Sequence, residues 1–243
     1  MRVRRDLLVL GAVATALLIA IVAFAASTTV TSQREQPTPT ATPASERDLF
    51  GGSLEPRVRY RTRSFAPTLS FVAGDSEWLV EQATERSHLV VERRVRVNRP
   101  GSELPSQSAV IFSRIYELID PATGTQLPRD ENLYAWFTHH PDLRVGRAEP
   151  VTIAGIDGLR FDEAVRFKRP ARSAAACRAQ LTVCTLIAPE RYFPSGVRMH
   201  TIVLPLGPEA PLVIDIVGRT ERDLDAVEAP AEELLRTLTV TRP

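Results

Sequence analysis

The chain divides into three stretches of different hydrophobic patterning. Residues 7–26 form one apolar run without a charge or a proline, whereas residues 27–57 are mostly polar and rich in Ser, Thr and Pro. From residue 58 onward, apolar and polar positions alternate as they do in a folded domain. The pattern therefore predicts an apolar N-terminal helix at 7–26, an extended linker at 27–57 and a single folded domain at 58–243.

Most of the folded part is predicted to be β-strand. Short runs rich in β-branched or aromatic residues are bounded by Pro or Gly, which is typical of strands. Turns are expected at 121–124, 155–158 and 205–211, and 197–204 with 212–217 is expected to form a hairpin. Leu212, Ile214 and Ile216 should face one side of their strand and Asp215 the other. The predicted strands are 68–71, 89–97, 109–120, 151–153, 159–167, 197–204 and 212–217.

Two segments have helical spacing. In 130–139, Leu133, Trp136 and Phe137 fall on one face, Asp130 suits the N-cap, and Pro141 should end the helix. The second helix is expected at 223–238, with its core stripe at Leu234, Leu235 and Leu238. Pro230 should break this second helix or start its second part. Strands with two helices predict an α+β fold in which an antiparallel sheet packs with flanking helices.

The N-terminal run is long enough to cross a bilayer. Twenty residues at helical rise span ~30 Å. The preceding six residues carry three arginines and one aspartate, so they should stay in the cytoplasm and place the rest of the chain outside. The length favours a retained transmembrane signal anchor. Ala23 and Ala25 offer a cleavage site, so a removed signal peptide and a secreted domain remain the alternative.

Composition limits the partners of the domain. The formal net charge is +1 and the first six residues carry +2, so residues 7–243 sum to about −1. This balance argues against nucleic acid as a partner and leaves no acidic surplus for binding cations. Arginines outnumber the single lysine, Lys168, by 29 to 1, which is typical of a GC-rich bacterial gene. The exterior is then the extracytoplasmic face of a bacterial plasma membrane.

Cys177 and Cys184 are the only cysteines of the chain. Two cysteines outside the cytoplasm usually pair, and the loop that they would close is worth about 2.5 kcal/mol on the chain-entropy estimate. Their spacing matches neither a redox C-x-x-C pair nor a zinc-ligand pattern. We expect a structural disulfide between them, with free or metal-bound thiols as the alternative.

No catalytic or cofactor motif stands out elsewhere. The chain lacks a G-x-S-x-G elbow, an S-x-x-K pair, a P-loop and an H-E-x-x-H pair. His139 and His140 are adjacent, so they point in different directions, and a position at a helix end favours a capping role. Asp162 and Glu163 are neighbours on a predicted strand, where successive side chains face opposite ways. We therefore expect no cofactor, metal or catalytic residue.

Several segments together resemble small anchored extracytoplasmic domains of bacteria with the PsbP/Mog1-like fold. They are the run from Tyr60 to Phe71 followed by Trp78, the segment Leu133–Trp136 before His140-Pro141, the turn at 155–158, and the helix-to-strand ending at 232–240. The resemblance implies an antiparallel sheet with flanking helices and a role in binding or assembly. It carries over no functional residue, because members of this group are largely without assigned activity.

Three classes of function fit these observations. The first is a membrane-tethered extracytoplasmic binding domain for a protein partner or a small ligand. The second is a hydrolase whose active site forms only in three dimensions, with His139, His140 and Asp162 as candidates. The third is a structural component of the envelope. The missing catalytic motifs favour the first.

The predicted disulfide has a direct test. Reduction of the native protein should raise its intact mass by two hydrogens, because an oxidising exterior keeps Cys177 and Cys184 joined. Mass spectrometry before and after reduction measures this difference. Two thiols that alkylate freely in the native protein would contradict the pairing and weaken the extracytoplasmic assignment.

Overall fold

A computed structural model of the chain describes residues 46–82, 87–95, 106–129, 132–166, 184–188 and 191–242. All of them belong to one unit of the chain, Pro43–Pro243. The predicted membrane segment 7–26 and Cys177 lie outside the described residues, as does the side chain of Cys184, so the anchor and the disulfide stay predictions. In the part of the chain that is described, no helix combines the length and the apolar character needed to cross a membrane.

A large antiparallel sheet forms the centre of the domain. Its strand order is β10-β12-β15-β16-β7-β6-β5-β2, and β11 also pairs with β12. β1 and β2 lie N-terminal to residue 58, where the patterning predicts the domain to begin. The strands of the large sheet are β2 (Gly52–Ser53), β5 (Trp78–Gln82), β6 (His88–Val95), β7 (Ser106–Arg114), β10 (Leu143–Val145), β11 (Glu149–Ile153), β12 (Ile156–Val165), β15 (Arg198–Leu204) and β16 (Leu212–Gly218).

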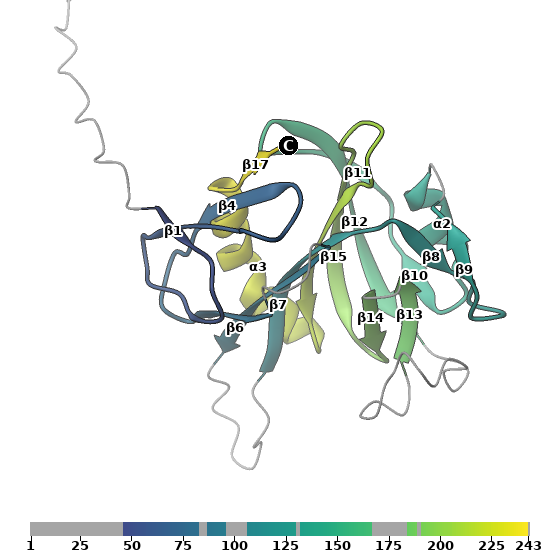
Figure 1. The fold of residues 1–243 in the computed structure, drawn as a ribbon. Coiled ribbons are helices and arrows are strands. Elements are labelled where there is room, and N and C mark those ends of the chain that lie inside the picture. Colours follow the sequence, from purple (N-terminus) through teal and green to yellow (C-terminus); the bar gives the residue numbers. More distant parts are fainter. Residues whose placement is uncertain are drawn as a thin grey trace, which may run out of the picture. The chain divides into compact units, whose positions relative to one another are not determined.

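Three smaller sheets and two described helices surround the large sheet (Figure 1). In the four-stranded sheet β1-β3-β4-β17, the pair β1–β3 is parallel and the other pairs are antiparallel. β8 pairs with β9, and β13 with β14. These elements are β1 (Glu46–Asp48), β3 (Arg59–Arg61), β4 (Thr68–Val72), β8 (Glu117–Ile119), β9 (Gln126–Pro128), α2 (Leu133–His139), β13 (Cys184–Ala188), β14 (Arg191–Pro194), α3 (Glu221–Arg236) and β17 (Thr239–Thr241).

β16 is buried along its whole length because the large sheet is covered on both faces. Leu212, Ile214 and Ile216 join a core with α3 and the four-stranded sheet. Val213 and Val217 join a second core with α2 and the β13–β14 hairpin. The predicted alternation is therefore confirmed. Asp215 lies on the face of the second core, where the Thr201 hydroxyl donates a 2.8 Å hydrogen bond to its carboxylate.

α3 starts earlier than its sequence predicts and continues through Pro230. Thr220 is the N-cap and forms a capping box with Asp223, whereas the prediction began the helix at Asp223. A proline inside a helix costs about 3 kcal/mol. Buried apolar residues lie on both sides of it, among them Leu224, Val227, Ala231, Leu234 and Leu235. Their packing holds the helix together across the missing hydrogen bond, so the predicted break was wrong.

α2 is shorter than expected. Its N-cap is Asn132, whose side chain accepts a hydrogen bond from the Ala135 amide, so the assignment of Asp130 as the cap was wrong. Either residue type can cap a helix, and the pattern alone does not choose between positions two residues apart. The helix ends at His139, before Pro141, as predicted.

Two turns also differ from the prediction. β11 and β12 join through a two-residue turn at Ala154-Gly155, where both residues have positive φ, and not through residues 155–158. Positive φ at both positions suits the twist of a tight hairpin. The predicted strand 109–120 is two strands, because β7 ends at Arg114 and β8 starts at Glu117. At the level of a mostly antiparallel sheet with two described helices, the α+β fold class is confirmed.

Close packing at the end of β16 gives a test of this fold. A Cβ added at Gly218 would overlap the backbone of Leu224, so α3 would have to move away from the sheet. We expect Gly218→Ala to lower the free energy of unfolding by about 1–3 kcal/mol, as measured by urea denaturation. Gly51→Ala is the matched control, because its new Cβ would lie 3.7 Å from the Val80 carbonyl oxygen, an ordinary contact. Equal effects of the two changes would contradict the packing of α3 on β16.

Candidate functional site

Two adjoining depressions are the main candidate site in the described part of the domain. The first, which we call the apolar groove, has a volume of about 920 Å³ and is lined by Tyr134, Leu159, Val203 and the prolines of the 205–211 loop. The second, which we call the arginine hollow, has a volume of about 640 Å³ and includes Arg114 and Tyr116. Arg129, Pro208 and Glu209 line both, so the two depressions are continuous.

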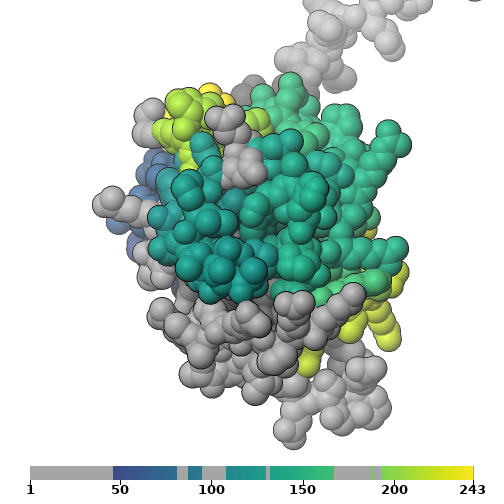
Figure 2. All heavy atoms as spheres, turned by 90° about the vertical axis from the view of Figure 1, so that its right-hand side faces the viewer, coloured from purple at the N-terminus to yellow at the C-terminus, as the bar shows by residue number. Residues whose placement is uncertain are grey.

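The groove lies where the large sheet meets α2 and the loop between β15 and β16. Leu159 on β12 pairs with Val203 on β15. Gly158 allows this close pairing, because a Cβ there would overlap the Val203 carbonyl. The loop 205–211 contains three prolines and turns at Gly207, where φ is +76°. The teal and green part of the chain, which includes β8, β9 and α2, forms much of the face seen in Figure 2.

Tyr134 is a fixed wall of the groove. Its hydroxyl donates to the Gly146 carbonyl at 3.1 Å and accepts from the Ala148 amide at 3.2 Å. Its ring packs on Phe161 in the second core, with 5.0 Å between the ring centroids. A side chain held at both ends is pre-organised, so a ligand would not have to order it on binding.

Arg114 is the buried charge of the hollow. It is the last residue of β7, and its side chain is only 2% exposed. Nη1 donates to the Ala66 carbonyl, and Nη2 donates to Oε2 of Glu209 at 3.0 Å. The guanidinium also lies over the ring of Tyr116, 5.5 Å from the centroid. A buried cation needs such partners, because desolvation of an unpaired charge is costly.

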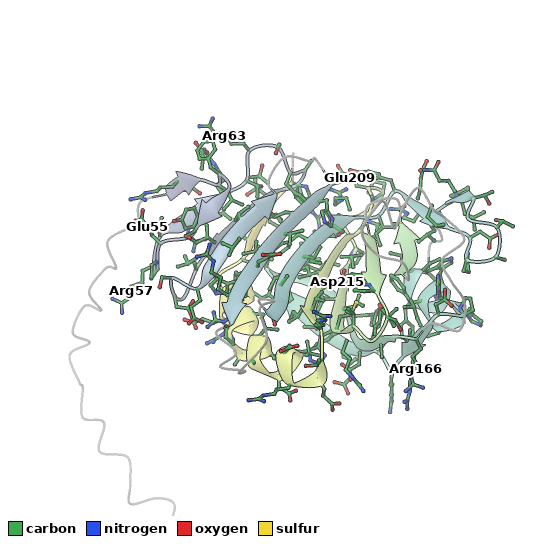
Figure 3. All side chains as sticks on the ribbon, turned by 90° about the horizontal axis from the view of Figure 1, so that it is seen from below. Glu55, Arg57, Arg63, Arg166, Glu209 and Asp215 are labelled. Carbon is green, nitrogen blue, oxygen red and sulfur yellow. The ribbon has the colours of Figure 1, made fainter. Side chains whose placement is uncertain are left out.

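Arg129 and Glu209 join the hollow to the groove. Arg129 Nη1 donates to the backbone carbonyl of Glu209 at 2.7 Å. Figure 3 shows Glu209 beyond the ends of the strands of the large sheet and Asp215 among these strands. Among the described residues that line the hollow, the charged side chains are those of Arg114, Arg129 and Glu209, so the hollow carries a formal charge of +1.

Two exposed apolar side chains belong to this site. The described large hydrophobic residues that are most exposed are Phe50, Tyr116, Leu127 and Leu159. Tyr116 lines the hollow and Leu159 lines the groove. Exposed apolar surface beside a depression is typical of a binding site.

The catalytic candidates from the sequence do not come together. His139 is exposed at the end of α2, with Nδ1 2.6 Å from the Ala135 carbonyl oxygen, and His140 is buried with its ring 5.0 Å from that of Trp136. Asp162 pairs with His200 on the face of the sheet that carries α3. α2 packs on the opposite face. Within the described ranges, no group of three or more His, Cys, Asp or Glu side chains could hold a metal ion.

His200, for which the sequence suggested no role, belongs to an ionic cluster between the sheet and α3. Its Nδ1 lies 2.7 Å from Asp162 and its Nε2 3.3 Å from Glu228. Arg160 bonds Glu228 and Glu232 on the same helix. Burial lowers the pKa of Arg160, but the hydrogen bonds of Glu232 and Glu228 outweigh it, so this pKa is raised above its ordinary value. These contacts link β12 and β15 to α3.

The sequence did not identify Arg114, Arg129 and Glu209 as residues of a candidate site. One signal was present, since Arg114 interrupts an otherwise apolar and small-residue run from Ser108 to Ile115. A charge inside such a run is a sign of a buried partner. The partners themselves, Ala66 and Glu209, are 48 and 95 residues away in the chain, so the sequence alone could not identify them.

Comparison with known proteins yields only distant similarity. No protein-family model and no curated protein sequence matches the chain. Among solved structures, the cyanobacterial PsbP of Synechocystis is 13% identical with a TM-score of 0.34, over 71% of this chain and 86% of that one. The Ran-binding protein Mog1p of Saccharomyces cerevisiae is 12% identical with a TM-score of 0.38, over 76% of this chain and 96% of that one, and a Mog1 mutant gives the same values. The α+β architecture itself follows from the sheet and helix topology described above.

Proposed function

We propose that this chain is a membrane-tethered extracytoplasmic binding domain of the PsbP/Mog1-like type, and that the apolar groove is its ligand site. The groove is the observation that carries the proposal. Its volume of about 920 Å³ lies within the range of about 300–1,000 Å³ found for small-molecule sites, and its lining combines apolar side chains with a few polar groups.

The construction of the groove supports binding. Tyr134 is held by two hydrogen bonds and a ring contact, and prolines restrict the 205–211 loop, which also lines the groove. Leu159 is 38% exposed, so it offers apolar surface that a ligand would cover. A largely pre-formed site of this kind retains more of the contact energy as affinity, because little ordering is needed on binding.

The size of the site favours a small ligand with an apolar body over a protein partner. A standard protein interface buries about 800 Å² on each side and involves about 20–30 residues of each partner. The groove is a concave depression that continues into the hollow at Arg129, Pro208 and Glu209. A protein partner remains the alternative occupant.

The enzyme alternative has less support. It requires His139, His140 and Asp162 to share a pocket, and none of the three is among the described residues that line the groove or the hollow. The groove also lacks a nucleophile beside a base among its described lining residues. Binding without catalysis is therefore the function that we propose.

The membrane tether belongs to the proposal on sequence grounds. Residues 7–26 are long and apolar enough to span a bilayer, and the basic hexapeptide before them orients the domain to the outside. The Ser/Thr/Pro-rich linker would then hold the groove away from the lipid surface. A cleaved N-terminal segment would give the same domain in secreted form.

Octanamide, a neutral molecule with an apolar chain, tests the groove. We expect saturable binding to the full-length chain in lipid nanodiscs, measured by isothermal titration calorimetry with empty nanodiscs as the blank. Leu159→Asn should weaken this binding about five- to tenfold, because part of the apolar contact is lost.

Leu127→Asn is the matched control for Leu159→Asn. Leu127 has the same exposed fraction of 38% but is absent from the described lining of the groove. The control should bind octanamide as tightly as the unchanged chain does. No saturable binding, or equal weakening by both changes, would contradict the groove as the ligand site.

A further inference from the structure

Arg114 has a buried donor that the described contacts leave unused. Its side chain is 2% exposed, and its Nε has no hydrogen-bond partner anywhere in the described structure. The two terminal nitrogens both donate, one to Ala66 and one to Glu209. Buried donors are nearly always satisfied, so this exception requires an explanation, and an acceptor that binds in the hollow would provide one.

The position of this donor defines how an acceptor could bind to Arg114. Nε and Nη2 lie on one edge of the guanidinium, and this edge can hold a carboxylate through two parallel hydrogen bonds. Glu209 accepts from Nη2 through one oxygen at 3.0 Å and makes no bond to Nε. The resident carboxylate therefore does not form the two-bond pair that this edge allows.

Glu209 is suited to leave its place. It comes from the 205–211 loop and its side chain is 48% exposed, so its carboxylate can move into water at little cost. The Ala66 carbonyl would continue to hold Nη1 of Arg114. An incoming carboxylate could then take the whole Nε–Nη2 edge.

Charge and shape favour an anion at this point. Two arginines and one glutamate line the hollow within its described part, which leaves one positive charge in excess. The guanidinium lies over the ring of Tyr116 and the Arg114 side chain is almost fully buried, which strengthens an ionic contact. The hollow opens into the apolar groove through Arg129, Pro208 and Glu209.

We propose that the arginine hollow recognises the carboxylate of a small amphipathic ligand. The ligand carboxylate displaces Glu209 and accepts hydrogen bonds from Nε and Nη2 of Arg114, while the apolar body lies in the groove. This inference rests on the proposed function, because it names the chemical class of the ligand of that same site.

Octanoate and octanamide form a matched pair of probes, because they differ only in the charge and hydrogen bonding of the head group. On the full-length chain in zwitterionic nanodiscs, octanoate should bind about tenfold more tightly than octanamide, since charge-assisted hydrogen bonds are about twice as strong as neutral ones. Arg114→Lys keeps the charge but removes the two-donor edge, so it should abolish most of this preference.

A second variant keeps the proposal testable if Arg114→Lys does not fold. Glu209→Gln removes the competing carboxylate from an exposed loop, so it should raise octanoate affinity about three- to tenfold and change octanamide affinity by less than that. Asp225→Asn is the matched control, because it removes one negative charge from an exposed residue of α3. α3 follows the far end of β16, about 20 Å along the strand from Leu212.

The outcomes separate the two proposals. Octanoate and octanamide that bind equally would overturn the carboxylate site and leave the groove in place. Octanoate affinity that is unchanged or lower in Glu209→Gln would also overturn it, because Glu209 would then be a fixed structural partner of Arg114. Failure of both probes to bind would overturn the groove and the carboxylate site together.

Discussion

The burial of β16 on both faces is the constraint on which the rest of the structure depends. Leu212, Ile214 and Ile216 require α3 and the four-stranded sheet on one side, and Val213 and Val217 require α2 and its neighbours on the other. The pairing register of such a strand must be fixed, because a shift by one residue would move its side chains to the opposite face of the sheet. The loop 205–211 leads into the first residue of β16, Leu212, which pairs with Arg114 at the end of β7. The core thereby positions Glu209 next to Arg114, and with it the wall shared by groove and hollow.

The strands could be predicted from the sequence where burial and local pattern agree. β4, β15 and β16 were found because β-branched and apolar residues alternate between clear turn signals. The errors arose where a tertiary contact decides. Pro230 should end a helix, but apolar residues on both sides of it are fixed against the sheet. The tight turn at Ala154-Gly155 was missed because Gly158 also resembles a turn residue, whereas its real role is to let β12 pass close to β15.

The candidate site was much less predictable than the fold. Histidines and neighbouring carboxylates attract attention in a sequence. In the structure, however, His139 lies against the Ala135 carbonyl and His140 packs on Trp136, whereas Asp162 contacts His200 on the opposite face of the sheet. The groove and hollow consist of common residue types such as Tyr, Leu, Pro and Arg, brought together from β7, β12, β15, α2 and a loop. No local spacing indicates such a site. Its chemistry depends on the burial of Arg114, which only the assembled core reveals.

The central claim is that the groove and the hollow form one site for an amphipathic carboxylate. The most direct measurement is a crystal structure of the complex with octanoate. We predict that the octanoate carboxylate lies within about 2.7–3.0 Å of both Nε and Nη2 of Arg114, with Glu209 turned to solvent and the alkyl chain in the groove. Octanoate bound elsewhere, or Glu209 still on Nη2 with Nε of Arg114 unpaired, would contradict the account.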